Sequence, residues 1–193
     1  MSVLTDSTGS AFGAKVGSDF RLRTQAVVKT DEHIHSDEGD AFYMNSATTA
    51  NTLTATATGG TIMFLKNDDA AKNLIIQDIQ ISTDTTAGVI RIVRNPTLGS
   101  IADNNVFVPV NENFGSAATA TVTAYTWDEV NDGLGGLSAG TVVETFIMPV
   151  GVEVVDVAGR YILTQGNSIM IDYLAKAAEI TMGIRFYMES TSE

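Results

Sequence analysis

Hydrophobic and polar residues alternate along much of the chain, and this alternation predicts strands. The clearest segment is 180–188, where Ile, Met and Phe occupy every even position and Thr, Gly, Arg and Tyr the odd ones. Segments 74–82, 88–94 and 168–173 show the same period of two over shorter lengths. A period of two sends successive side chains to opposite faces, which is typical of an antiparallel strand with one buried face.

Turn-forming residues divide the alternating segments into short strands. The strand expected at 61–66 ends at Asn67-Asp68-Asp69, a cluster typical of turns. The strand at 88–94 ends at Asn95-Pro96, because proline cannot donate a hydrogen bond to a strand ladder. About eight to ten strands at intervals of about 8–12 residues indicate an all-β fold, an antiparallel β-sandwich of the jelly-roll kind.

Three further strands are expected from composition as well as pattern. Residues 118–127 alternate Thr and aromatic side chains with Ala and Val, and a glycine separates the β-branched runs 141–150 and 152–157. A helical turn fits only within 173–180, and 175–178 is better explained as a connection. The 14 residues from Trp127 to Gly140 form the longest expected loop.

The beginning of the chain has a different residue composition. Residues 1–19 are rich in Ser, Gly and Thr, which predicts a flexible arm that orders only on a partner surface. Residues 20–28 form the first plausible strand, and the polar stretch 30–40 follows it. The expected division is therefore 1–45 for the arm and first strand, and 46–193 for the sandwich.

Composition narrows the possible functions. The 193 residues include 11 Lys and Arg, 23 Asp and Glu and no Cys, so the formal net charge is −12. Without cysteine there is no disulfide, zinc–thiolate site or thiol nucleophile. The acidity argues against binding to nucleic acid or to an anionic membrane, both of which need clustered cations. Because no secretory signal and no span of roughly 20 apolar residues occurs, we expect a soluble protein made in a cytoplasm.

The sharpest local motif is His33-Ile34-His35. On a strand, residues at i and i+2 point the same way, so two imidazoles and the nearby Asp37 are candidate metal ligands. The chain has no third histidine to complete a cupin-type site, and a solvated acidic loop explains the segment better. A metal shared between subunits is a third interpretation. Because the solvated acidic loop is the better explanation, we expect no cofactor.

Gly136–Gly140 matches the G-x-S-x-G motif of hydrolases, with Ser138 in the place of the nucleophile. The motif needs a strand-to-helix turn and a histidine later in the chain. Here a β-branched run follows the motif, and both histidines precede it. A glycine-punctuated loop is the better interpretation, and we expect no enzymatic activity.

Two patterns favour a binding module. The acidic segments 67–69, 103–105 and 128–132 invite calcium, although the spacing of an EF-hand is absent. Tyr125 and Trp127 share one face of an expected strand and offer a stacking surface for a sugar, although core or interface packing is more common for such pairs.

The order of several short motifs is similar to that of a known group of proteins. These motifs are Gly39–Asn45 (GDAFYMN), Leu65-Lys66-Asn67, the strand 74–82, Arg94–Thr97 (RNPT) and Asn111–Ser116 (NENFGS). In order and texture the chain resembles accessory structural proteins of tailed-bacteriophage virions over residues 20–188.

This resemblance implies a β-sandwich, often a jelly roll, that decorates or cements a capsid, usually as a homotrimer. The implied partner is the major capsid protein or another virion protein, and the implied location is the virion, assembled in the host cytoplasm. A tail- or fibre-associated protein and a carbohydrate-binding module are the alternatives. A metal-dependent enzyme built on His33 and His35 is the remaining hypothesis.

Overall fold

The computed structural model describes ten segments of the chain. They are residues 4–5, 11–12, 31–46, 51–53, 60–83, 87–102, 104–127, 135–138, 140–174 and 178–191. The chain divides into two compact units, residues 1–30 and residues 31–193. Residues 31–45, which were expected to belong with the arm, therefore lie in the second unit.

The first unit contains one described feature, an antiparallel pair of short strands. These are β1 (Leu4–Thr5) and β2 (Ala11–Phe12). Apart from these two strands, the arm expected over 1–19 lies outside the described residues. The strand expected over 20–28 lies outside them entirely.

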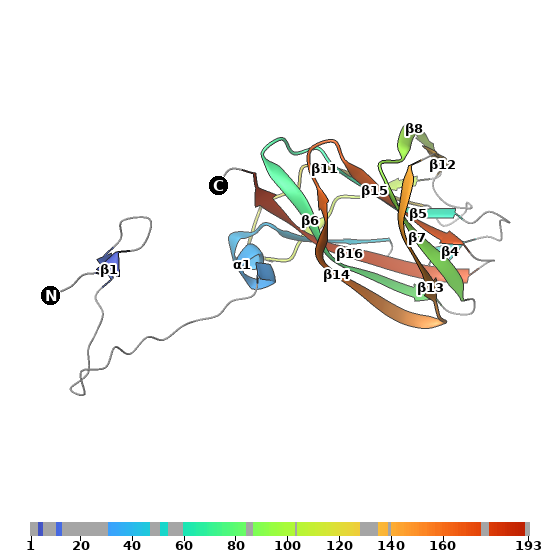
Figure 1. The fold of residues 1–193 in the computed structure, drawn as a ribbon, viewed down its shortest axis with the longest axis horizontal. Coiled ribbons are helices and arrows are strands. Elements are labelled where there is room, and N and C mark those ends of the chain that lie inside the picture. The colour runs from blue at the N-terminus through green and yellow to red at the C-terminus, as the bar shows by residue number, and fades with distance from the viewer. Residues whose placement is uncertain are drawn as a thin grey trace. The chain divides into compact units, whose positions relative to one another are not determined.

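The second unit is built from two six-stranded antiparallel sheets (Figure 1). The first sheet has the order β10 (Val110–Asn111), β3 (Ala41–Asn45), β16 (Ala178–Ser190), β6 (Lys72–Thr83) and β14 (Gly151–Leu163), with β4 (Asn51–Leu53) also paired to β16. The second sheet has the order β13 (Thr141–Met148), β7 (Gly88–Arg94), β15 (Ser168–Leu174), β5 (Gly60–Asn67), β11 (Val122–Trp127) and β9 (Asn104–Val106). A two-stranded sheet pairs β12 (Gly135–Ser138) with β8 (Thr97–Ala102). The predicted antiparallel β-sandwich is confirmed.

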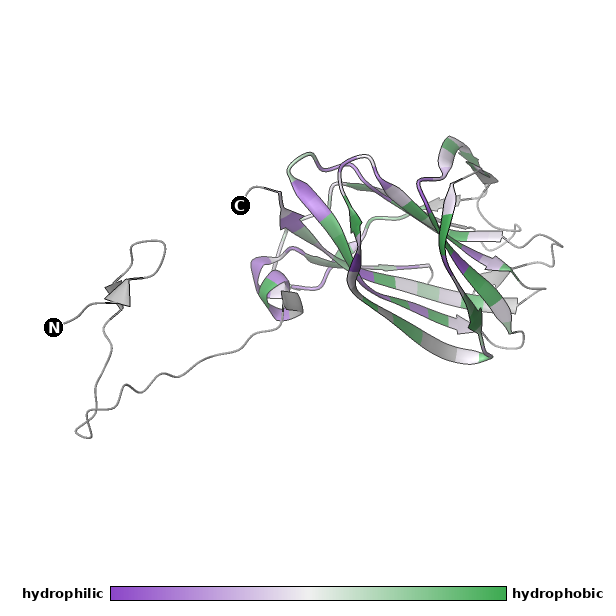
Figure 2. Ribbon diagram, viewed as in Figure 1, coloured by the Kyte–Doolittle hydropathy of each residue, from purple (hydrophilic) through white to green (hydrophobic). Residues whose placement is uncertain are grey.

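The core lies between the two six-stranded sheets and follows the alternation of the sequence (Figure 2). In β16 every even-numbered apolar side chain is buried: Ile180, Met182, Ile184, Phe186 and Met188. They belong to one cluster with side chains of the second sheet, among them Met63, Ile92 and Ile171. Burying an apolar side chain contributes about 1.5–3 kcal/mol, so this shared interior is the main source of stability.

A buried asparagine joins the two sheets at one end of the sandwich. The Asn67 side chain is fully buried, and its amide nitrogen donates hydrogen bonds to the carbonyls of Lys72 (2.8 Å) and Leu163 (2.7 Å). Its side-chain oxygen accepts from the backbone N–H of Asp69 at 2.9 Å. Satisfying these groups avoids the cost of a buried polar group left without partners.

One prediction about secondary structure was wrong. The polar stretch that includes His33 and His35 is not a loop or a strand but the helix α1 (Asp31–Glu38). Gly39 has a φ of 77° and ends the helix in a Schellman motif, in which Asp40 N–H bonds the carbonyl of His35 and Gly39 N–H that of Ser36.

Two element bounds also differ from expectation. The strand expected at 118–127 begins only at Val122, and residues 118–121 are irregular. The expected loop from Trp127 to Gly140 contains β12, whose pairing with β8 supplies the backbone hydrogen bonds that a free loop would lack.

Replacing a core ring should cost far more stability than replacing an exposed one. Phe186 is 1% exposed and stacks on Phe42 with centroids 5.7 Å apart, whereas Phe114 is 97% exposed. We expect Phe186→Ala to lower the free energy of unfolding by about 3–5 kcal/mol and Phe114→Ala by less than about 0.5 kcal/mol. Urea unfolding of dilute protein measures both, and equal losses would contradict the assigned core.

Candidate functional site

The two histidines do not point toward a common metal. Residues at i and i+2 of a helix lie on nearly opposite sides, unlike those of a strand. His33 lies 3.3 Å from Asp37 and is more than half exposed. His35 turns inward and stacks on Tyr187 of β16, with centroids 4.0 Å apart. Within the described segments, no group of three or more His, Asp or Glu residues is placed to hold a metal.

The described acidic turn serves the chain itself. Asp68 accepts hydrogen bonds from Lys66 Nζ and Thr123 Oγ1, both at 2.5 Å. Burial alone would raise the pKa of Asp68, but these bonds and the Lys66 charge hold it below its usual value. Asp69 accepts from the backbone N–H of Ala71 at 2.8 Å. The other calcium candidates are the segments 103–105 and 128–132. Asp103 and residues 128–132 lie outside the described residues, and Asn104 and Asn105 belong to β9.

The structure also places two other candidates from the sequence, the Ser138 motif and the pair Tyr125 and Trp127. Ser138 ends β12, opposite Thr97 of β8, and β13 begins at Thr141, so the strand-to-helix turn of a hydrolase is missing here. Tyr125 is half-buried, with its ring centroid 6.2 Å from that of Phe64. The backbone of Trp127 belongs to β11, whereas its side chain lies outside the described part of the chain.

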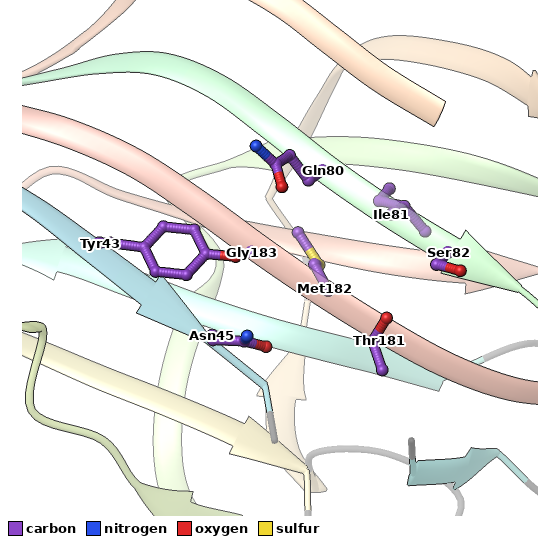
Figure 3. A pocket seen from close by; sticks show the side chains of 8 residues that line it. All are labelled: Tyr43, Asn45, Gln80, Ile81, Ser82, Thr181, Met182 and Gly183. Carbon is purple, nitrogen blue, oxygen red and sulfur yellow. The ribbon is translucent and has the colours of Figure 1, made fainter. Parts of the chain in front are cut away.

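A shallow hollow of about 290 Å³ lies on the outer face of the first sheet, where β3, β16 and β6 are neighbours (Figure 3). Gly183 is at its centre, between Asn45 and Gln80 in the strand register. The Tyr43 ring leans over Gly183, and a Cβ at position 183 would overlap the Tyr43 hydroxyl. Ser82 and Thr181 complete a lining of neutral polar groups and one aromatic ring.

An ion cluster adjoins this hollow. The Arg185 guanidinium lies 3.1 Å from Glu112 and 3.5 Å from Asp78, and its carbon is 5.8 Å from the centre of the Tyr43 ring. Burial raises the pKa of Tyr43, Arg185 opposes this shift, and the two carboxylates add to it. Tyr43 therefore remains a neutral phenol at ordinary pH. These groups can bind polar ligands, but they do not pair a nucleophile with a base.

The two borders of the sandwich carry exposed apolar side chains. At one border lie the edge strands β9 and β10. The β9–β10 edge is defined here by four side chains that are 57–97% exposed: Val106, Val108, Val110 and Phe114. At the other border is the β13–β14 edge, defined by Val142, Val143, Ile147, Val150 and Val154, of which Ile147 is 80% exposed. The signal for the first edge was present in the run Val106–Val110, which contains no polar side chain.

A cleft of about 200 Å³ lies beside the β13–β14 edge. Arg94 of β7 and Arg160 and Tyr161 of β14 line it, together with apolar side chains that include Val143 and Ile169. The Tyr161 hydroxyl donates a hydrogen bond to Glu144 of β13, which joins the two sheets at this border. Burial and the bonded, charged Glu144 raise the pKa of Tyr161 to about 12, and Arg160 opposes them.

Comparison of the chain with protein-family models, curated proteins and solved structures found no match. In the described part of the chain, no helix has the length and apolar character needed to cross a membrane. The two apolar edges, the neutral hollow and the arginine-lined cleft are the surface features of the described residues that are suited to contact with a partner or ligand.

The bond from Tyr161 to Glu144 predicts a loss of stability at high pH. An unfolded tyrosine loses its proton near pH 10, whereas Tyr161 in the folded protein keeps it to about pH 12. The contribution of this residue is therefore full below pH 10 and declines between pH 10 and 12. We expect the advantage in Tm of the wild type over Tyr161→Phe to shrink across that range in thermal melts. A constant difference would contradict the shift.

Proposed function

We propose that the chain is a non-enzymatic structural protein of a bacteriophage virion. In this proposal it decorates or cements the capsid by binding neighbouring subunits, and it assembles as a homotrimer. A position on the tail or a fibre is the alternative location. The observation that carries the proposal is the pair of apolar edges.

Edge strands present unpaired backbone groups, and monomeric proteins usually protect them with Lys, Pro or bulges. Here the β9–β10 and β13–β14 edges contain Pro109 and Pro149, and β13 and β14 have register shifts, but both edges also carry Val or Ile at exposed positions. Contiguous apolar surface of this kind is typical of a protein interface. Two different edges, one on each border, fit a head-to-tail contact that closes into a ring better than a two-fold contact of identical surfaces.

The strand order supports a jelly roll as the specific type of sandwich. We infer a jelly roll, because β3-β16-β6-β14 in the first sheet faces β5-β15-β7-β13 in the second. Eight strands in this order interleave the two halves of the chain, as two Greek keys do. Jelly rolls occur in viral capsid proteins and in lectins, so the fold is compatible with the proposal and with its main alternative.

An acidic side chain on an apolar edge should weaken assembly. Ile147 is exposed in the isolated chain, so Ile147→Asp should leave the fold unchanged but place a charge in the interface. We expect a trimer for the wild type in sedimentation velocity, and association weakened by about tenfold or more in the variant.

The control is Leu98→Asp, which adds the same charge at an exposed apolar side chain of β8, outside both edges. It should assemble as the wild type does. Labelled wild type should also bind capsids that lack this protein, whereas a wild type that is monomeric and has no affinity for capsids would refute the proposal.

The neutral hollow favours a second candidate function, carbohydrate binding. An aromatic ring beside hydroxyl and amide groups matches the alternating apolar and polar surface of a sugar. The candidate stacking residue is then Tyr43, in place of the sequence candidates Tyr125 and Trp127.

Removing the Tyr43 ring should weaken any such binding. On a glycan array we expect Tyr43→Ala to weaken binding about tenfold, because the stacking surface is lost, and Tyr43→Phe to retain most of it. Tyr125→Ala is the control and should bind as the wild type does. Binding that depends on Tyr125 and not on Tyr43 would place the site elsewhere.

A further inference from the structure

Arg94 is unusual among the cations of this acidic protein. The other Lys and Arg side chains that the structure describes each lie within 3.7 Å of a carboxylate; these are Lys66, Lys72, Arg91, Arg160 and Arg185. Arg94 forms no ion pair with any described residue, although acidic residues outnumber basic ones 23 to 11. A guanidinium without a carboxylate partner among the described residues is suited to binding a carboxylate from another molecule.

The cleft around Arg94 has the size and chemistry to bind one acidic side chain. Arg94 comes from β7 of the second sheet and Arg160 from β14 of the first, so two arginine residues from opposite sheets line one cavity. Arg160 is only partly neutralised, because Glu144 lies 3.7 Å away and also accepts the Tyr161 bond. The volume of about 200 Å³ is below the roughly 300–1,000 Å³ of small-molecule pockets.

The complementary surface lies on the same chain, next to the opposite border. Helix α1 reads DEHIHSDE, with four acidic residues and no Lys or Arg. Asn113, next to the β9–β10 edge residue Phe114, donates a hydrogen bond at 3.4 Å to the backbone carbonyl of Asp37. The Glu38 side chain is 60% exposed and has only a 3.9 Å contact with His35. Each copy therefore presents acidic and apolar groups together near one border, and basic and apolar groups together at the other.

We propose that Glu38 of one copy binds in the Arg94–Arg160 cleft of the next, while the β9–β10 edge contacts the β13–β14 edge. This inference rests on the self-association in the proposed function and assigns the residues that determine its geometry. Because the two surfaces differ, each copy uses one surface toward each neighbour, which is the requirement for a closed ring. Charge pairing of this kind fixes register and partner orientation.

A charge exchange between the two residues tests the contact in the full-length chain. Arg94→Glu and Glu38→Arg should each lower the association constant by about tenfold or more, because like charges then meet. The double variant carries both changes and should associate within about threefold of the wild type. Sedimentation equilibrium at about 0.1 M salt measures all four proteins, and thermal melts check that each is folded.

The control is Glu189→Arg, which makes the same charge change at an exposed position of β16 and should not alter association. A wild-type oligomer that is unaffected by Arg94→Glu would overturn this inference and leave the proposed function standing. Disruption by Arg94→Glu without recovery in the double variant would also overturn the pairing with Glu38. A wild type that is monomeric at every concentration would instead refute the self-association itself.

Discussion

The register of β16 against β3 and β6 determines most of what the first sheet presents to solvent. Its even-numbered side chains fill the core, so its odd-numbered ones must face outward. That placement puts Gly183 beneath Tyr43, Arg185 between Asp78 and Glu112, and Tyr187 beneath His35. A slip of one residue would exchange the two faces and expose five large apolar side chains, which makes this register strongly specified. The hollow, the ion cluster and the contact between α1 and β16 thus all result from the register of β16.

The sequence allowed the sandwich to be predicted because its strands obey a period of two that burial then reproduces. It did not allow α1 to be predicted, since DEHIHSDE has one aliphatic residue and no apolar stripe. That helix depends on tertiary contacts instead: His35 stacks on Tyr187, and Gly39 packs so closely to Ser116 that a side chain there would clash. The metal hypothesis for His33 and His35 assumed strand geometry, so its premise was wrong once the segment proved helical. The Glu38-Gly39 pair was the available signal, because glycine often follows the last turn of a helix.

The surfaces were harder to predict than the core, for a physical reason. Alternation reports which face of a strand is buried, but not which strand lies at a border of its sheet. Val142 and Ile147 are β-branched residues like those of any strand, and they become informative only because β13 is an edge. The cleft similarly brings together Arg94 and Arg160 from different sheets, and no local spacing marks such a pair. The hollow depends on Tyr43 leaning over Gly183, which requires the register of two distant strands.

The pairing of charges and the placement of apolar residues both fit a molecule that associates with copies of itself. An acidic protein keeps dense arrays of copies soluble through mutual repulsion, yet repulsion also opposes the association that a coat requires. Apolar edges supply attraction that salt does not screen, and a few opposite charges at the contact then select orientation. The described cations other than Arg94 are paired within the fold, where they stabilise cross-strand contacts such as Arg91 with Asp172 at 2.8 Å. Among the described cations, Arg94 is therefore the one best placed to select the orientation of a neighbour in the proposed assembly, and the partly neutralised Arg160 lies beside it in the cleft.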